Sequence, residues 1–107
     1  MTNETKDILM QRLYKIAEHN GLKDVATISF KKRNKILEPL KAKNSDAFTI
    51  ANNFIETQIK LDRIKNDKEK QEKNSVQWTA EILTAEKEQA SAEEQLQTYC
   101  KSNKISI

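Results

Sequence analysis

Apolar residues recur every three or four positions in the first part of the chain, as they do on one face of a helix. The members of this face are Leu9, Met10, Leu13, Ile16 and Ala17. Polar residues such as Lys15 and Glu18 occupy the opposite side, so the spacing predicts a helix over about residues 5–20 with one buried face. Gly21 follows this segment and suits the left-handed position just past a helix C-terminus.

A second apolar segment begins at Leu22 and predicts a helix that begins after this residue and runs to about Leu37. Pro39 lacks a backbone donor and disfavours helical geometry at the residue before it, so the helix is expected to end there. The apolar residues of this segment spread over roughly 200° of the helix circumference, which predicts burial between other helices or beneath a partner. A loop is expected over residues 41–45, with Ser45 as the N-cap of the next helix.

From Ile50 onward, one set of positions recurs in alternating steps of four and three residues without slipping. The set is Ile50, Phe54, Thr57, Leu61, Ile64, Lys68, Gln71, Ser75, Trp78, Ile82, Ala85, Gln89, Ala92, Leu96 and Tyr99. A period of 3.5 residues is typical of a left-handed helical seam, in which such side chains pack between helices. Three consecutive polar members, Lys68, Gln71 and Ser75, interrupt the seam in its middle.

Two architectures explain this interruption. In the first, residues 46–66 and 76–102 are separate helices that fold back on each other as an antiparallel hairpin, with a polar turn between them. In the second, one continuous helix covers residues 46–102 and must pair with another chain. Compactness favours the hairpin. The fold class is therefore predicted to be all-α, with an N-terminal helix pair over residues 1–44 and long coiled-coil-like helices over residues 45–107.

Composition supports a helical fold and limits its core. A single Gly and a single Pro in 107 residues are too few for a sheet with tight hairpins. Only 36% of the residues are hydrophobic and 33% are charged, so a partner or a second copy would help to stabilise the fold. The lone Cys100 excludes an intramolecular disulfide, and no apolar run approaches the length of a membrane span. We therefore expect a cytoplasmic protein that does not associate with membranes.

The residue types needed for catalysis are scarce. One His and one Cys cannot supply a four-ligand zinc site, and one Gly cannot form a glycine-rich phosphate loop. His19 lies off the apolar face of its predicted helix, which indicates a surface histidine. The sequence therefore predicts a protein that is not an enzyme and that has no metal and no cofactor.

A basic segment suggests one possible partner class. Residues 23–43 hold seven Lys or Arg against two acidic residues, a net charge of +5, although the whole chain has only +3. Residues 16–22 resemble the middle of a helix-turn-helix motif, with the small Ala17 four residues before Gly21. The match departs from the motif at Thr27, where a buried aliphatic residue is expected. This interpretation implies a dimeric nucleic-acid-binding regulator that contacts phosphates through Lys31, Lys32, Arg33 and Lys35.

The seam favours a different function, namely the binding of another protein, of a second copy as a homodimer, or of both. The residues predicted to form the partner-binding seam are Phe54, Leu61, Trp78, Ile82, Leu96 and Tyr99. Trp78 is the largest of them and lies beside the polar interruption, so it is the leading candidate for a partner anchor. We take a helical protein-interaction module of the adaptor, chaperone or inhibitor type as the main hypothesis and nucleic-acid binding as the alternative.

Overall fold

The computed structural model describes residues 2–67 and 75–106. Within these ranges the chain forms helices and no strands, so the prediction of an all-α fold is confirmed. The α-helices are α1 (Asn3–His19), α2 (Asn34–Lys43), α3 (Ser45–Lys65) and α5 (Ser75–Ser102). Two short 3-10 helices, η1 (Val25–Thr27) and η2 (Phe30–Lys32), lie between α1 and α2.

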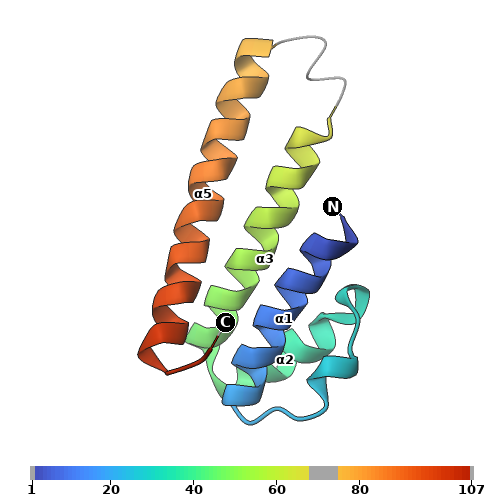
Figure 1. The fold of residues 1–107 in the computed structure, drawn as a ribbon, viewed down its shortest axis with the longest axis vertical. Coiled ribbons are helices and arrows are strands. Elements are labelled where there is room, and N and C mark those ends of the chain that lie inside the picture. The colour runs from blue at the N-terminus through green and yellow to red at the C-terminus, as the bar shows by residue number, and fades with distance from the viewer. Residues whose placement is uncertain (1, 68–74, 107) are drawn as a thin grey trace.

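Helices α3 and α5 lie side by side and run in opposite directions (Figure 1). Helix α1 packs against the lower part of α3, and α2 packs against α3 near the same end (Figure 1). The molecule measures 48 × 26 × 22 Å. Its long dimension is close to the length of α5, about 42 Å at about 1.5 Å per residue. The polar turn expected over residues 68–74 lies outside the described residues.

The prediction for the first helix is confirmed in its face and in its end. All five apolar residues of the predicted face are at most 4% exposed. At the C-terminus, Leu22 N–H donates to Ala17 C=O and Gly21 N–H donates to Glu18 C=O, both at 3.0 Å. These two hydrogen bonds form a Schellman motif, which requires a positive φ at Gly21; the observed value is +90°.

The second helix does not begin just after Leu22, so that part of the prediction is wrong. After Asp24, whose φ is +58°, the chain forms η1 and η2 and becomes α-helical only at Asn34. Buried Val25 and the hydrogen bond from Tyr14 Oη to Ile28 C=O hold this irregular segment against α1. The apolar residues predicted to share one wide helix face are therefore divided between this irregular segment and α2, which contains Ile36 and Leu37.

The expected helix end at Pro39 is also wrong, because α2 contains this proline. Pro39 cannot donate to the carbonyl of Lys35, but both residues are exposed and water can reach that carbonyl. Three large aliphatic residues of α2 are at most 3% exposed, and their burial offsets the lost hydrogen bond. They are Ile36, Leu37 and Leu40.

The predicted loop over residues 41–45 is reduced to the single residue Asn44. Its side-chain oxygen accepts from Ala47 N–H at 3.2 Å, so Asn44 is the N-cap of α3, one residue earlier than the predicted Ser45. Asn and Ser both cap helices well, and the sequence alone does not decide between neighbouring candidates.

The seam positions lie inside the chain. Every seam position whose side chain is described is buried or half-buried. The buried ones are Phe54, Leu61, Ala85, Ala92 and Leu96. Since α3 and α5 supply these residues to the interface between them, the seam is occupied within one molecule.

Candidate protein-binding face

The residues predicted to bind a partner are used mainly by the chain itself. Phe54, Leu61 and Leu96 are 3%, 6% and 1% exposed, which leaves almost none of their surface for another molecule. Trp78, Ile82 and Tyr99 are half-buried. The indole N–H of Trp78 donates to Ile64 C=O at 3.0 Å, so the predicted anchor joins α5 to α3. A surface for a partner must therefore come largely from other residues.

Helix α5 has a second set of residues at heptad spacing, which the sequence analysis missed. Its members also follow steps of four and three, and all eight are exposed. They are Val76, Ala80, Leu83, Lys87, Ala90, Glu94, Gln97 and Lys101. We call these residues the outer stripe. The signal was present in the sequence, but only the structure separates the stripe that faces α3 from the one that faces solvent.

The outer stripe exposes apolar surface at one end. Val76 is 80% exposed and Leu83 is 53% exposed. Together with Ile8 they are the large hydrophobic residues that the described part of the chain leaves exposed. Val76 and Leu83 are seven residues apart on α5 and therefore lie on the same side of the helix.

A shallow groove between α3 and α5 adjoins the outer stripe. It consists of two hollows of about 440 and 380 Å³, and Gln95 lines both. The first hollow is formed by Ile50, Glu94, Gln95, Thr98, Tyr99, Ser102 and Asn103. The second is formed by Asn53, Thr57, Lys87, Glu88, Ser91, Ala92 and Gln95. Since Glu94 and Lys87 belong to both stripe and groove, the two features form one continuous surface, which we call the outer face.

Ion pairs distinguish the charges of the outer stripe from the other charges of α5. Three glutamates of α5 bind cations of the same chain: Glu88 with Lys60 at 3.1 Å, Glu93 with Arg12 at 3.1 Å and Glu86 with Lys65 at 3.6 Å. Within the described residues, Lys87 and Glu94 form no ion pair. Their charges are therefore available to a molecule that covers the outer face.

Titratable groups with shifted pKa values lie away from this face. Burial raises the pKa of the Cys100 thiol, and the nearby charges of Arg12 and Lys15 oppose that shift. Burial also raises the pKa of Tyr14, with a smaller contribution from the charge of Asp7. A protonated, buried thiol is a poor nucleophile. Among the described residues, no three His, Cys, Asp or Glu side chains gather where they could hold a metal ion.

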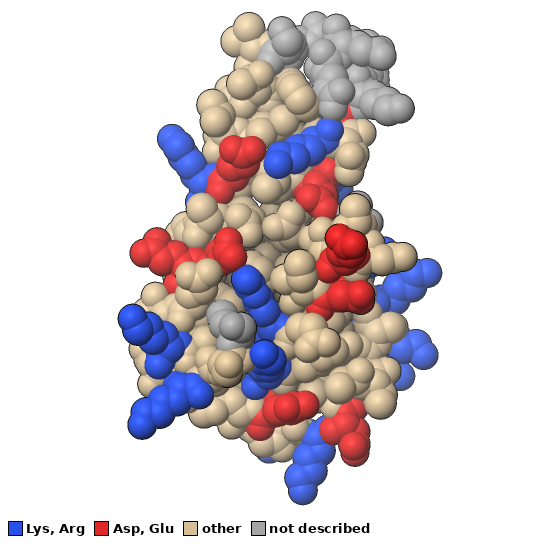
Figure 2. Space-filling model, in the orientation of Figure 1, with Lys and Arg blue, Asp and Glu red and all other residues tan. Residues whose placement is uncertain are grey.

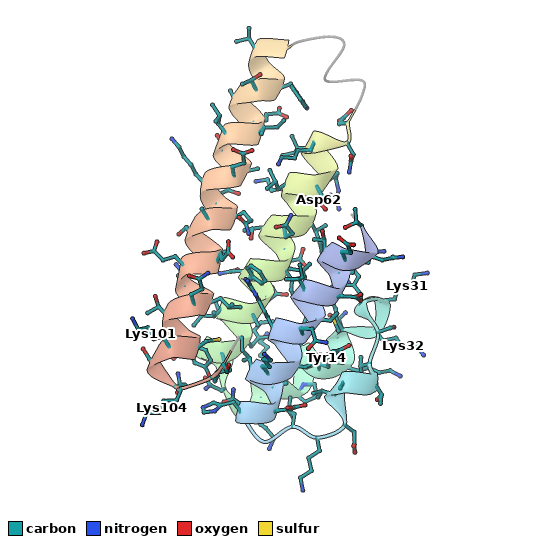
Figure 3. The ribbon with its side chains drawn as sticks, viewed as in Figure 1. Tyr14, Lys31, Lys32, Asp62, Lys101 and Lys104 are labelled. Atoms are coloured by element: carbon teal, nitrogen blue, oxygen red, sulfur yellow. The ribbon has the colours of Figure 1, made fainter. Side chains whose placement is uncertain are left out.

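The predicted nucleic-acid contacts do not act as one group. Lys31 and Lys32 extend from η2 into solvent (Figure 3), and Lys35 is also exposed. The guanidinium of Arg33 instead lies 4.5 Å from the centre of the Phe30 ring and 3.7 Å from a carboxylate oxygen of Glu56. Arg33 therefore fastens η2 to the helices and has less freedom to meet a phosphate.

The second helix that the helix-turn-helix interpretation requires is not formed, because no α-helix follows Gly21 until Asn34.

Basic side chains lie in much of the lower half of the molecule (Figure 2). Lys101 and Lys104 lie on the opposite side from Lys31 and Lys32 (Figure 3), so the positive charge is spread over several sides.

None of the helices in the described ranges is both long and apolar enough to cross a membrane. Comparison with protein-family models, with curated proteins and with solved structures gave no match for this chain.

Proposed function

We propose that this chain is a non-enzymatic helical protein-interaction module that binds its partner through the outer face. The observation that carries the proposal is the outer stripe, whose eight members keep heptad spacing along α5 and are all exposed. Positions at this spacing occur on every helix, but four of these eight, Val76, Ala80, Leu83 and Ala90, are apolar, which favours contact with another helix. The exposed Val76 and Leu83 add apolar surface on the same side of α5.

The groove beside the stripe supports the same proposal. A helix laid along α5 would cover the stripe and place side chains at the two hollows. The groove has apolar groups from Ile50, Ala92 and Tyr99, and polar groups from Asn53 and Gln95 that can bond to the rim of a partner. The partner is another protein or a second copy of the chain.

A buried, free Cys100 suits a reducing compartment such as the cytoplasm.

Site-specific photocrosslinking tests this proposal. A benzophenone on Ser91→Cys, at the centre of the outer face, is compared with the same group on Ala42→Cys, an exposed position of α2. Both variants are made with Cys100→Ala and added to extract of the source cells. We expect a discrete protein adduct from position 91 that position 42 does not give, and its loss in a Leu83→Glu variant of unchanged helicity. The same adducts from both positions, or none from position 91, would contradict the proposal.

Nucleic-acid binding remains the alternative function. The observation in its favour is that Lys31, Lys32 and Lys35 are exposed and, within the described residues, form no ion pair. Such lysines suit contacts to phosphates, which do not depend on base sequence.

A further inference from the structure

The charges of the outer stripe alternate in sign. Lys87, Glu94 and Lys101 follow one another at intervals of seven residues, about 10 Å along the helix, and all three are exposed. Ala90 lies between Lys87 and Glu94 and has almost no side chain to hold a second helix away. The apolar members Val76, Ala80 and Leu83 precede this charged part.

Among two-fold symmetric pairs of α5, this arrangement is self-complementary only when the two helices are antiparallel. If two copies of α5 paired parallel and in register, each lysine would face a lysine and each glutamate a glutamate, which is unfavourable. If they pair antiparallel about a two-fold axis near Ala90, Lys87 of each copy meets Glu94 of the other. The symmetry forms this ion pair twice.

The antiparallel arrangement also covers Leu83, but not Val76, which lies opposite position 105, beyond the end of α5 at Ser102. Leu83 then lies against the stretch from Glu94 to Lys101 of the second copy. The aliphatic parts of these side chains can cover Leu83 while their charged ends stay in water. Leu83 is otherwise 53% exposed, so pairing removes apolar surface from solvent.

We infer that the outer stripe of α5 pairs antiparallel with the outer stripe of a second copy of this chain, with Lys87 bound to Glu94 across the two-fold axis. This inference rests on the proposed function, since it names the partner of the same face. A contact made mainly by one pair of helices is small, and exposed ion pairs add little affinity. We therefore expect a weak dimer with a dissociation constant on the order of 100 µM.

Charge reversal tests the pairing by sedimentation velocity over protein concentrations from about 10 µM to about 1 mM. Lys87→Glu and Glu94→Lys each place two like-charged pairs across the axis, and each should weaken the dimer roughly tenfold or more. An equimolar mixture of the two variants should recover the original affinity, because every contact between the different copies is again of opposite sign. The double variant K87E/E94K should recover it as well.

The matched controls are Lys35→Glu and Glu38→Lys on α2, which change the net charge equally at exposed positions away from α5. They should leave the dimer unchanged. Circular dichroism of each variant checks that helicity is retained.

A chain that stays monomeric up to about 1 mM overturns the inference, and so does a dimer that ignores both reversals or is not restored by mixing. None of these results contradicts the proposed function, which the photocrosslinking experiment tests separately. A protein of different mass captured at Ser91 by a monomeric chain supports the protein-interaction module and overturns self-pairing.

Discussion

Asn20 at the end of α1 donates a hydrogen bond of 3.1 Å from Nδ2 to Tyr99 Oη on α5, although 79 positions separate the two residues. The other end of the same amide, Oδ1, accepts from Asn44 Nδ2 at 3.1 Å. Asn44 in turn caps α3. One side-chain amide therefore ties the end of α1 to the start of α3 and to the last turns of α5.

Removing either end of the Asn20–Tyr99 bond should destabilise the fold. Tyr99→Phe loses one neutral hydrogen bond, and we expect a loss of about 1 kcal/mol in the free energy of unfolding. Asn20→Ala should cost more, about 2 kcal/mol, because it also leaves Asn44 without this partner. Urea unfolding of the wild type, both single variants and the double variant gives the coupling energy. Strictly additive effects would show that the bond contributes nothing.

Gly21 should resist substitution because of its backbone conformation. A Cβ added at this position would meet nothing closer than Lys43 Nζ at 3.5 Å, so there is no steric clash with neighbours. The positive φ of +90° is the obstacle, and Gly21→Ala should lower the unfolding free energy by about 1–2 kcal/mol. Gly21→Asn should cost less, since Asn tolerates positive φ better than Ala does. Equal losses for Ala and Asn would point to a cause other than φ.

Stability should fall at alkaline pH. Burial raises the pKa of Cys100 in the folded chain above its ordinary value of 9.0, which applies to the unfolded chain. Between pH 9.0 and the pKa of the folded chain, the unfolded chain therefore releases a proton that the folded chain keeps. The stability that Cys100 contributes is therefore full below about pH 9 and is lost as the pH rises further. The raised pKa of Tyr14, whose ordinary value is 10.0, acts in the same direction at higher pH.

Urea midpoints measured between about pH 7.5 and 10.5 check this prediction for wild type and for Cys100→Ala. The variant should lose less stability over this interval than the wild type does. An identical pH dependence in both proteins would exclude Cys100 as a cause. In the folded wild type, thiol reagents should label Cys100 only slowly, because it is 1% exposed.

The elements that the sequence predicted correctly are those fixed by local periodicity and capping chemistry. The face of α1 and its end at Gly21 needed no knowledge of the rest of the fold. The segment from Leu22 to Arg33 was predicted wrongly because tertiary contacts, namely the burial of Val25 and the hydrogen bond from Tyr14 to the Ile28 carbonyl, hold it in an irregular conformation. Likewise, α2 continues past Pro39 because the burial of Ile36, Leu37 and Leu40 offsets the backbone hydrogen bond that a proline cannot donate.

The site was harder to predict than the fold. Both the inner seam and the outer stripe have the same spacing on α5, and periodicity alone does not say which of them a second helix of the same chain covers. Trp78 was the leading anchor because of its size, but its indole joins α5 to α3. The sequence did not predict the outer stripe as a binding surface, because its middle and end contain the charged residues Lys87, Glu94 and Lys101, which are expected to face solvent.

The basic residues allow the two proposed partner classes to be compared. As a phosphate-binding surface, Lys31, Lys32 and Lys35 would bind mixed-sequence duplex with a dissociation constant of about 10⁻⁴ M or tighter at physiological salt. The logarithm of the binding constant would then fall against that of the salt concentration with a slope of about −3. A protein-interaction module predicts no such binding, because Arg33 is tied to Phe30 and Glu56 and no recognition helix follows Gly21.

Fluorescence anisotropy with a labelled duplex at several salt concentrations distinguishes the two functions. The variant K31E/K32E is compared with K101E/K104E, which changes the net charge equally on the opposite side of the molecule (Figure 3). Because we favour the protein-interaction module, we expect no binding tighter than about 10⁻⁴ M for the wild type. Tighter binding that K31E/K32E abolishes and K101E/K104E retains would favour the nucleic-acid alternative, since only a localised phosphate site distinguishes the two pairs. Equal weakening by both pairs would instead indicate attraction to the net charge of the chain, which is no basis for a specific function.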